Sequence, residues 1–73
     1  MAVKVQIELT TDLPIARECG AVKGRVFDAE YKYTETTDDG VEYPAKVRDR
    51  PVEFTGDNGD LCVAFSYEYK RAQ

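Results

Sequence analysis

Apolar and polar residues alternate strictly at the start of the chain. Val3, Val5, Ile7 and Leu9 point to one side, and the polar residues between them point to the other. A period of two over seven residues is typical of a strand with one buried face. We therefore predict a strand over residues 3–9. Because this strand has no proline, we expect its edge, with Val3 and Val5, to be open to pairing with an extended peptide.

The same alternation returns further along the chain. Phe27, Ala29, Tyr31 and Tyr33 share one face of a second strand that starts near residue 22. Three more segments have strand character, over residues 41–48, 52–54 and 61–66.

In two of these strands, the residues indicate where the strand lies in the sheet. Pro44 cannot donate to a ladder, so its strand is expected to lie at an edge, at least locally. Residues 61–65 are almost continuously apolar, which favours a central strand covered on both sides. The tail over residues 67–73 carries several charges and is expected to fray.

The segments between the strands are rich in turn-forming residues. Within residues 10–20, Thr11 or Asp12 is placed to cap a short helical turn that Gly20 ends. Gly24 is placed to form a bulge or a bend at the start of the second strand.

Two further segments read as hairpin turns. Asp39-Gly40 supplies the positive φ angles that a hairpin needs. Residues 56–60, GDNGD, are the strongest turn signal in the chain.

These elements predict one mostly-β domain over residues 1–73. Its expected fold is a small, strongly bent antiparallel sheet or an SH3-like barrel of about five strands, with a short helical turn. The barrel is the preferred architecture, and a curved sheet capped by residues 10–20 is the alternative.

Composition fits a folded domain and argues against an enzyme. Apolar residues make up 42% and charged residues 33% of the 73-residue chain. So short a chain buries only about 60% of its unfolded surface, so a catalytic cleft would consume much of its core. The chain has no histidine and a single serine, Ser66, which excludes a Ser/His/Asp triad. We predict no enzymatic activity, no cofactor and no metal.

The carboxylate pairs Asp38/Asp39 and Asp57/Asp60 are better explained by structure than by catalysis. Both pairs lie in glycine-containing turns, where aspartate is favoured for its local hydrogen bonds.

Cys19 and Cys62 are too far apart in the sequence for a CxxC pair. The chain shows no signal peptide and no apolar stretch long enough for a membrane helix. We expect a soluble, intracellular protein with reduced thiols, and a Cys19–Cys62 disulfide remains an alternative.

Candidate binding residues come from charge and aromatic placement. Lys46, Arg48 and Arg50 are spaced to line one face if their strand continues that far. Tyr67 and Tyr69 are candidates because tyrosine is enriched at interfaces. An ordinary solvated surface is the alternative for all of them. Acidic residues over 35–42 are either a solvated loop or an attraction for a basic partner.

A resemblance adds a possible function. The start MAVKVQIELT, the middle GRVFDAEYKYTETTDDG and the end TGDNGDLCVAFSYEYKR form a short acidic β-rich chain. In these features the whole chain resembles small bacteriophage-encoded transcription regulators that bind and inhibit host bacterial RNA polymerase. The resemblance implies contacts with the large polymerase subunits, β and the N-terminal segment of β′. It also implies displacement of sigma factor, suppression of termination and action in the host bacterial cytoplasm. It carries over no individual contact residue.

Two other functions stay open. One is an SH3-like nucleic-acid-binding module that uses Lys46, Arg48 and Arg50, and the other is a structural phage protein. The net charge of −4 disfavours binding to a bare phosphate backbone. We therefore expect no direct specific contact with nucleic acid. We also expect a monomer that binds protein.

Overall fold

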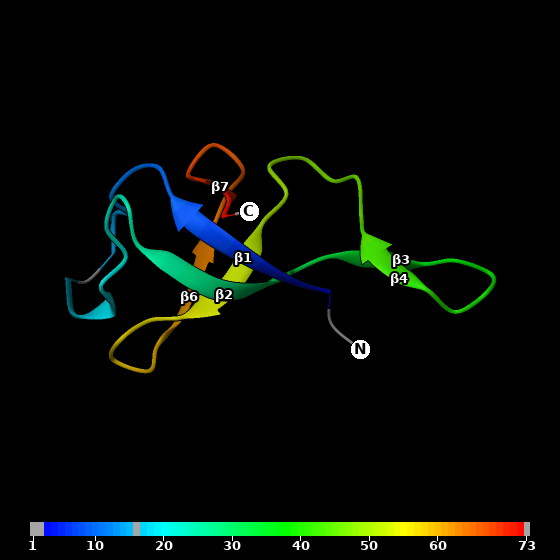
Figure 1. Ribbon diagram of the computed structural model, residues 1–73, viewed down its shortest axis with the longest axis horizontal. Helices are drawn as coiled ribbons and strands as arrows, with labels where there is room; N and C mark the ends of the chain where they lie inside the picture. Colours follow the sequence, from blue (N-terminus) through cyan, green and yellow to red (C-terminus); the bar gives the residue numbers. More distant parts are fainter. Residues whose placement is uncertain (1–2, 16, 73) are drawn as a thin grey trace.

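The protein is a curled sheet with a projecting arm, as the computed structural model of residues 3–15 and 17–72 shows (Figure 1). The elements in chain order are β1 (Lys4–Leu9), a 3-10 turn η1 (Arg17–Cys19), β2 (Val26–Tyr31), β3 (Thr34–Thr36), β4 (Glu42–Pro44), β5 (Val52–Thr55), β6 (Leu61–Ala64) and β7 (Tyr69–Arg71). Five strands form an antiparallel half-barrel in the order β6-β5-β2-β1-β7, and β3 pairs with β4 alone. The predicted small bent sheet is confirmed.

The alternation read from the sequence places the core inside the curl. Val5 lies opposite Ala29 and Ile7 lies opposite Phe27, so apolar side chains from neighbouring strands meet on one face. The Phe27 and Phe54 rings pack with centroids 4.5 Å apart. The buried cluster is Ile7, Leu9, Leu13, Cys19, Ala21, Phe27, Ala29, Val52, Phe54, Cys62 and Ala64.

Gly24 forms the bulge that the sequence predicts. Its N–H donates to the Leu9 carbonyl over 2.8 Å, while the Leu9 N–H donates to the Arg25 carbonyl over 2.9 Å. Gly24 and Arg25 on one strand therefore lie opposite Leu9 alone on the other. Gly24 has a φ of 90°. This is the geometry of a G1 bulge, which bends the strand as curling requires.

The predicted short helical turn is present as η1, and Gly20 ends it with a φ of 69°. The predicted cap is wrong in its detail. The Asp12 carboxylate accepts a hydrogen bond from the Lys23 N–H, so it stabilises the turn before β2 and not the start of η1. Leu13 joins the core, whereas Ile15 stays 41% exposed.

The strands of the main sheet differ from the predicted ones in two places. The predicted second strand divides at residues 32–33: β2 stays in the half-barrel and β3 leaves it. The predicted third strand shortens to β4 and pairs only with β3, so it forms the arm. Its place at an edge agrees with Pro44, since both strands of a two-stranded sheet are edges.

The ends of the main sheet correct two further predictions. β6 was predicted to be central, but it has β5 as its single neighbour, and Leu61 is 68% exposed. The tail predicted to fray instead forms β7, which pairs with the Ile7–Leu9 half of β1. Gln73 lies outside the described residues.

Glu68 closes part of the exposed β6 edge. Its carboxylate accepts a hydrogen bond from the Phe65 N–H at 3.0 Å, and its own N–H donates to the Phe65 carbonyl at 2.7 Å. Both backbone groups of Phe65 are therefore occupied, which shortens the edge that another strand can reach.

Candidate protein interface

The basic trio lies in a loop and not on a strand. β4 ends at Pro44, so the expected strand face for Lys46, Arg48 and Arg50 does not form. Asp49 and Arg50 have φ angles of 64° and 31°, which turns the chain sharply here. The three basic residues are all exposed, and the Arg48 side chain is 95% exposed.

Two hydrogen bonds join the basic loop, residues 46–50, to the turn that leads into β7. The Ser66 N–H donates to the Asp49 carbonyl at 2.7 Å. The Tyr69 hydroxyl donates to the Arg50 carbonyl at 2.8 Å. The structure therefore brings together two segments, residues 46–50 and 65–69, that hold five of the seven candidate residues.

Tyr69 has a structural role at this junction. Its ring is half-buried and packs against the core cluster. Burial raises the pKa of the Tyr69 hydroxyl, Tyr31 adds to this, and the Arg50 guanidinium opposes it. Tyr69 therefore holds the loop in place and offers little area to a partner.

Tyr67 and Phe65 supply the exposed aromatic area. Tyr67 is 68% and Phe65 is 38% exposed, and their rings stack with centroids 6.0 Å apart and planes at 18°. Phe65 was missed because the apolar run around it was interpreted as a central strand. We call Lys46, Arg48, Arg50, Phe65 and Tyr67 the basic–aromatic surface.

Val3 and Val5 do not form an open strand edge. The Tyr31 N–H donates to the Val3 carbonyl, and Val5 lies opposite Ala29, so the backbone groups of both valines face β2. The Val5 side chain packs against the core. On the other side, β7 covers Ile7–Leu9, and within the part of the chain that the structure describes this edge stays open only around Lys4.

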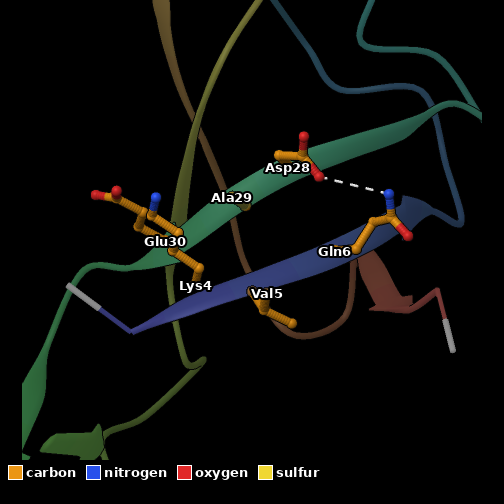
Figure 2. A pocket seen from close by; sticks show the side chains of 6 residues that line it. All are labelled: Lys4, Val5, Gln6, Asp28, Ala29 and Glu30. Atoms are coloured by element: carbon orange, nitrogen blue, oxygen red, sulfur yellow. Dashed lines mark hydrogen bonds between the residues drawn. The ribbon is translucent and has the colours of Figure 1, made fainter.

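A shallow hollow of about 400 Å³ lies over the outer face of β1 and β2 (Figure 2). Lys4, Gln6, Asp28 and Glu30 supply its polar side chains, and all four are exposed. The Gln6 amide donates to the Asp28 carboxylate at 3.4 Å. A second hollow of about 140 Å³ lies where β1 extends past Arg71. These polar, open surfaces hold none of the candidate residues except Val5.

Cys19 and Cys62 meet beside Gly56 as free thiols. Both are 4% exposed. Burial raises the pKa of the Cys62 thiol, and contact with Cys19 raises it further. The two cysteines, far apart in the sequence, thus join the core at the end of β5.

Within the described ranges, no three acidic or thiol side chains are grouped as a metal site requires. In the same ranges, no helix has the length and apolarity to cross a bilayer. Comparisons with protein-family models, curated proteins and solved structures found no match for this chain.

Proposed function

We propose that this chain is a bacteriophage-encoded regulator that binds host bacterial RNA polymerase through the basic–aromatic surface. In this proposal it works in the host cytoplasm, contacts the β′ N-terminal segment or the β subunit, displaces sigma factor and suppresses termination. The choice of polymerase rests on the resemblance of the whole chain to such regulators. The choice of surface rests on the structure.

The observation that supports this surface is the hydrogen bonding between residues 46–50 and residues 65–69. Two hydrogen bonds to the carbonyls of Asp49 and Arg50 hold a cationic loop beside an exposed aromatic pair. Arginine and tyrosine are the residue types that contribute most at protein interfaces. A surface fixed before binding also loses less conformational entropy when a partner covers it.

A second function uses the same surface. Cations beside a stacked aromatic pair also fit single-stranded nucleic acid, whose phosphates need charge and whose bases stack on rings. The net charge of −4 opposes this reading, since the rest of the molecule repels phosphate.

The test measures retention of purified bacterial RNA polymerase, with and without sigma factor, on the immobilised full chain. We expect core polymerase to be retained and sigma to be released. The Arg48→Glu plus Arg50→Glu variant should lower retention at least about tenfold, since lost charge pairs at interfaces commonly cost more than 1.4 kcal/mol. Arg17→Glu plus Lys23→Glu changes the charge equally on another exposed segment and should retain polymerase normally.

Failure to retain polymerase would refute the partner. Equal retention by the two charge-reversed variants would refute the surface. Tight binding of a labelled single-stranded oligonucleotide at low salt, lost in Arg48→Glu plus Arg50→Glu, would favour the nucleic-acid function instead.

A further inference from the structure

The arm carries the whole charge imbalance of the protein. The chain has 10 basic and 14 acidic residues, and residues 33–45 contain four of the acidic ones and none of the basic ones. The other residues are therefore balanced, with ten of each sign. The four acidic residues are Glu35, Asp38, Asp39 and Glu42.

The two faces of the arm differ in character. The Ala45 N–H donates to the Tyr33 carbonyl at 3.1 Å, the Thr37 N–H donates to the Val41 carbonyl at 2.9 Å, and Glu35 lies opposite Tyr43. Because side chains alternate along a strand, odd-numbered residues share one face. We call Tyr33, Glu35, Val41 and Tyr43 the odd face. The other face has Thr34, Thr36, Glu42 and Pro44, with the Thr34 hydroxyl donating to the Glu42 carboxylate at 3.0 Å.

The large exposed apolar groups of the arm all lie on the odd face. Tyr33 is 50%, Val41 is 60% and Tyr43 is 38% exposed. None of the side chains from 33 to 44 is buried, and Ala45, where the arm joins the half-barrel, is 7% exposed. Figure 1 shows the arm standing clear of the half-barrel, joined to it by two single passes of chain. An isolated two-stranded sheet is marginally stable in water, so covering this face would stabilise it.

Charge and aromatic chemistry indicate what fits the odd face. Glu35 lies between the exposed apolar groups, and its carboxylate accepts a hydrogen bond from Tyr43, which raises the pKa of the Tyr43 hydroxyl. Lys32 already places its ammonium 5.7 Å from the centroid of the Tyr33 ring. A guanidinium can stack on a tyrosine ring and pair with a carboxylate at once, which an ammonium does less well.

We propose that the odd face of the arm is a docking surface for an extended, arginine-rich segment of a partner protein. Arginine side chains at alternate positions stack on Tyr33 and Tyr43 and pair with Glu35, while aliphatic carbons cover Val41. Asp38 and Asp39 at the tip attract the segment. Pairing of two arms is disfavoured because it brings their acidic groups together. The inference is independent of polymerase as the partner of the basic–aromatic surface.

The test uses the isotope-labelled full chain and short synthetic peptides with arginine, lysine or glutamate at alternate positions. We expect the arginine peptide to shift the amide signals of residues 33–45 and to leave those of β5 and β6 in place. The lysine peptide should bind more weakly, and the glutamate peptide should not bind.

Variants separate the aromatic contribution from charge alone. Tyr33→Ser plus Tyr43→Ser keeps every charge and should weaken arginine-peptide binding about tenfold, the ratio that loss of two cation–π contacts gives. Adding Glu35→Gln to this variant should weaken binding of the arginine peptide further and make that binding less dependent on salt concentration. Thr36→Ala, on the opposite face, should bind normally. Unchanged barrel signals in each variant establish that the fold is kept.

Three outcomes would overturn the proposal. One is no binding of the arginine peptide, or shifts confined to residues outside the arm. Another is that Tyr33→Ser plus Tyr43→Ser binds the arginine peptide as tightly as the original chain does, which would show that the acidic residues attract it without specific contacts. The last is a concentration-dependent dimer abolished by Val41→Thr, which would make a second copy the occupant.

Discussion

The half-barrel and the arm are built from the same alternating pattern but differ in what covers it. In the half-barrel, the inward positions Ile7, Leu9 and Val52 are 0% exposed. In the arm, the corresponding positions Tyr33 and Val41 are 50% and 60% exposed. The apolar face of an alternating strand is therefore buried only where other strands curl over it.

The largest effect is expected in the half-barrel at Phe54. This ring is 3% exposed and packs on Phe27. Phe54→Ala should lower the free energy of unfolding by about 3–5 kcal/mol, which is most of the stability of a small domain. Tyr43→Ala in the arm should change it by about 0.5 kcal/mol or less. Chemical denaturation followed by fluorescence measures both, and comparable losses would contradict the distinction between the two regions.

Glycine substitutions should also lower stability more in the half-barrel than in the arm, but the difference should be smaller than for the aromatic residues. A Cβ on Gly56 would lie 2.9 Å from the Cys19 Cβ and 3.0 Å from its Cα, so Gly56→Ala should cost about 1–3 kcal/mol of global stability. A Cβ on Gly40 meets nothing within 4 Å, but its φ is 84°. Gly40→Ala should therefore cost about 1 kcal/mol locally, seen as faster amide exchange in the arm alone. Faster exchange throughout the barrel in that variant would show that the arm is coupled to it.

The Arg25–Asp57 pair of the half-barrel should contribute to the dependence of stability on pH. Arg25 donates to both oxygens of Asp57 at 2.9 Å, and this hydrogen bond lowers the pKa of Asp57 from its ordinary 3.8. Because the folded pKa lies below the unfolded one, the pair stabilises the fold above pH 3.8 and stops doing so as the pH falls through the lowered pKa.

Asp57→Asn should therefore reduce the loss of stability in acid. Denaturation midpoints at neutral and strongly acidic pH provide the measurement. Asp39→Asn, at the tip of the arm and away from Arg25, makes the same chemical change and serves as the control. If Asp57→Asn follows the same pH curve as the original chain, the pair has no role in acid stability.

A small effect on global stability is expected when the arm is removed. Replacing residues 34–44 with a short Asn-Gly turn leaves the buried cluster intact, because none of its members lies in that range. A shorter loop closes at a slightly lower entropic cost, so global stability should change by only about 1 kcal/mol. The amide spectrum of the barrel should be preserved, and its collapse would show that the arm is required for folding.

The turns and the bulge could be predicted from short stretches of sequence, because the backbone conformation that each residue type permits determines them. The bulge at Gly24, the turn that Gly20 ends and the hairpin at Gly40 all have positive φ angles that glycine permits. The strand order could not be predicted in this way. The apolar run at β6 indicated a central strand, but Leu61 is 68% exposed and β6 lies at an edge. The charged tail pairs with β1, where Lys70 lies 3.7 Å from Glu8.

The candidate site was predicted in its residue types but not in its geometry. Lys46, Arg48 and Arg50 were expected to line one face if their strand continued that far, whereas positive φ angles at Asp49 and Arg50 make a loop there. Non-glycine residues rarely adopt such angles, so the sequence did not predict them. The proximity of this loop to Tyr69 depends on a long-range hydrogen bond, which only the folded chain shows.

The uneven distribution of charge has a consequence for how the molecule moves toward a partner. The balanced barrel and the acidic arm lie toward opposite ends of a body 42 Å long, as Figure 1 shows. Such a body has a permanent dipole along its long axis, and the field of a charged surface exerts a torque on it within a Debye length of about 10 Å. We therefore expect the protein to rotate before contact, with its arm toward positive surfaces and its barrel toward negative ones.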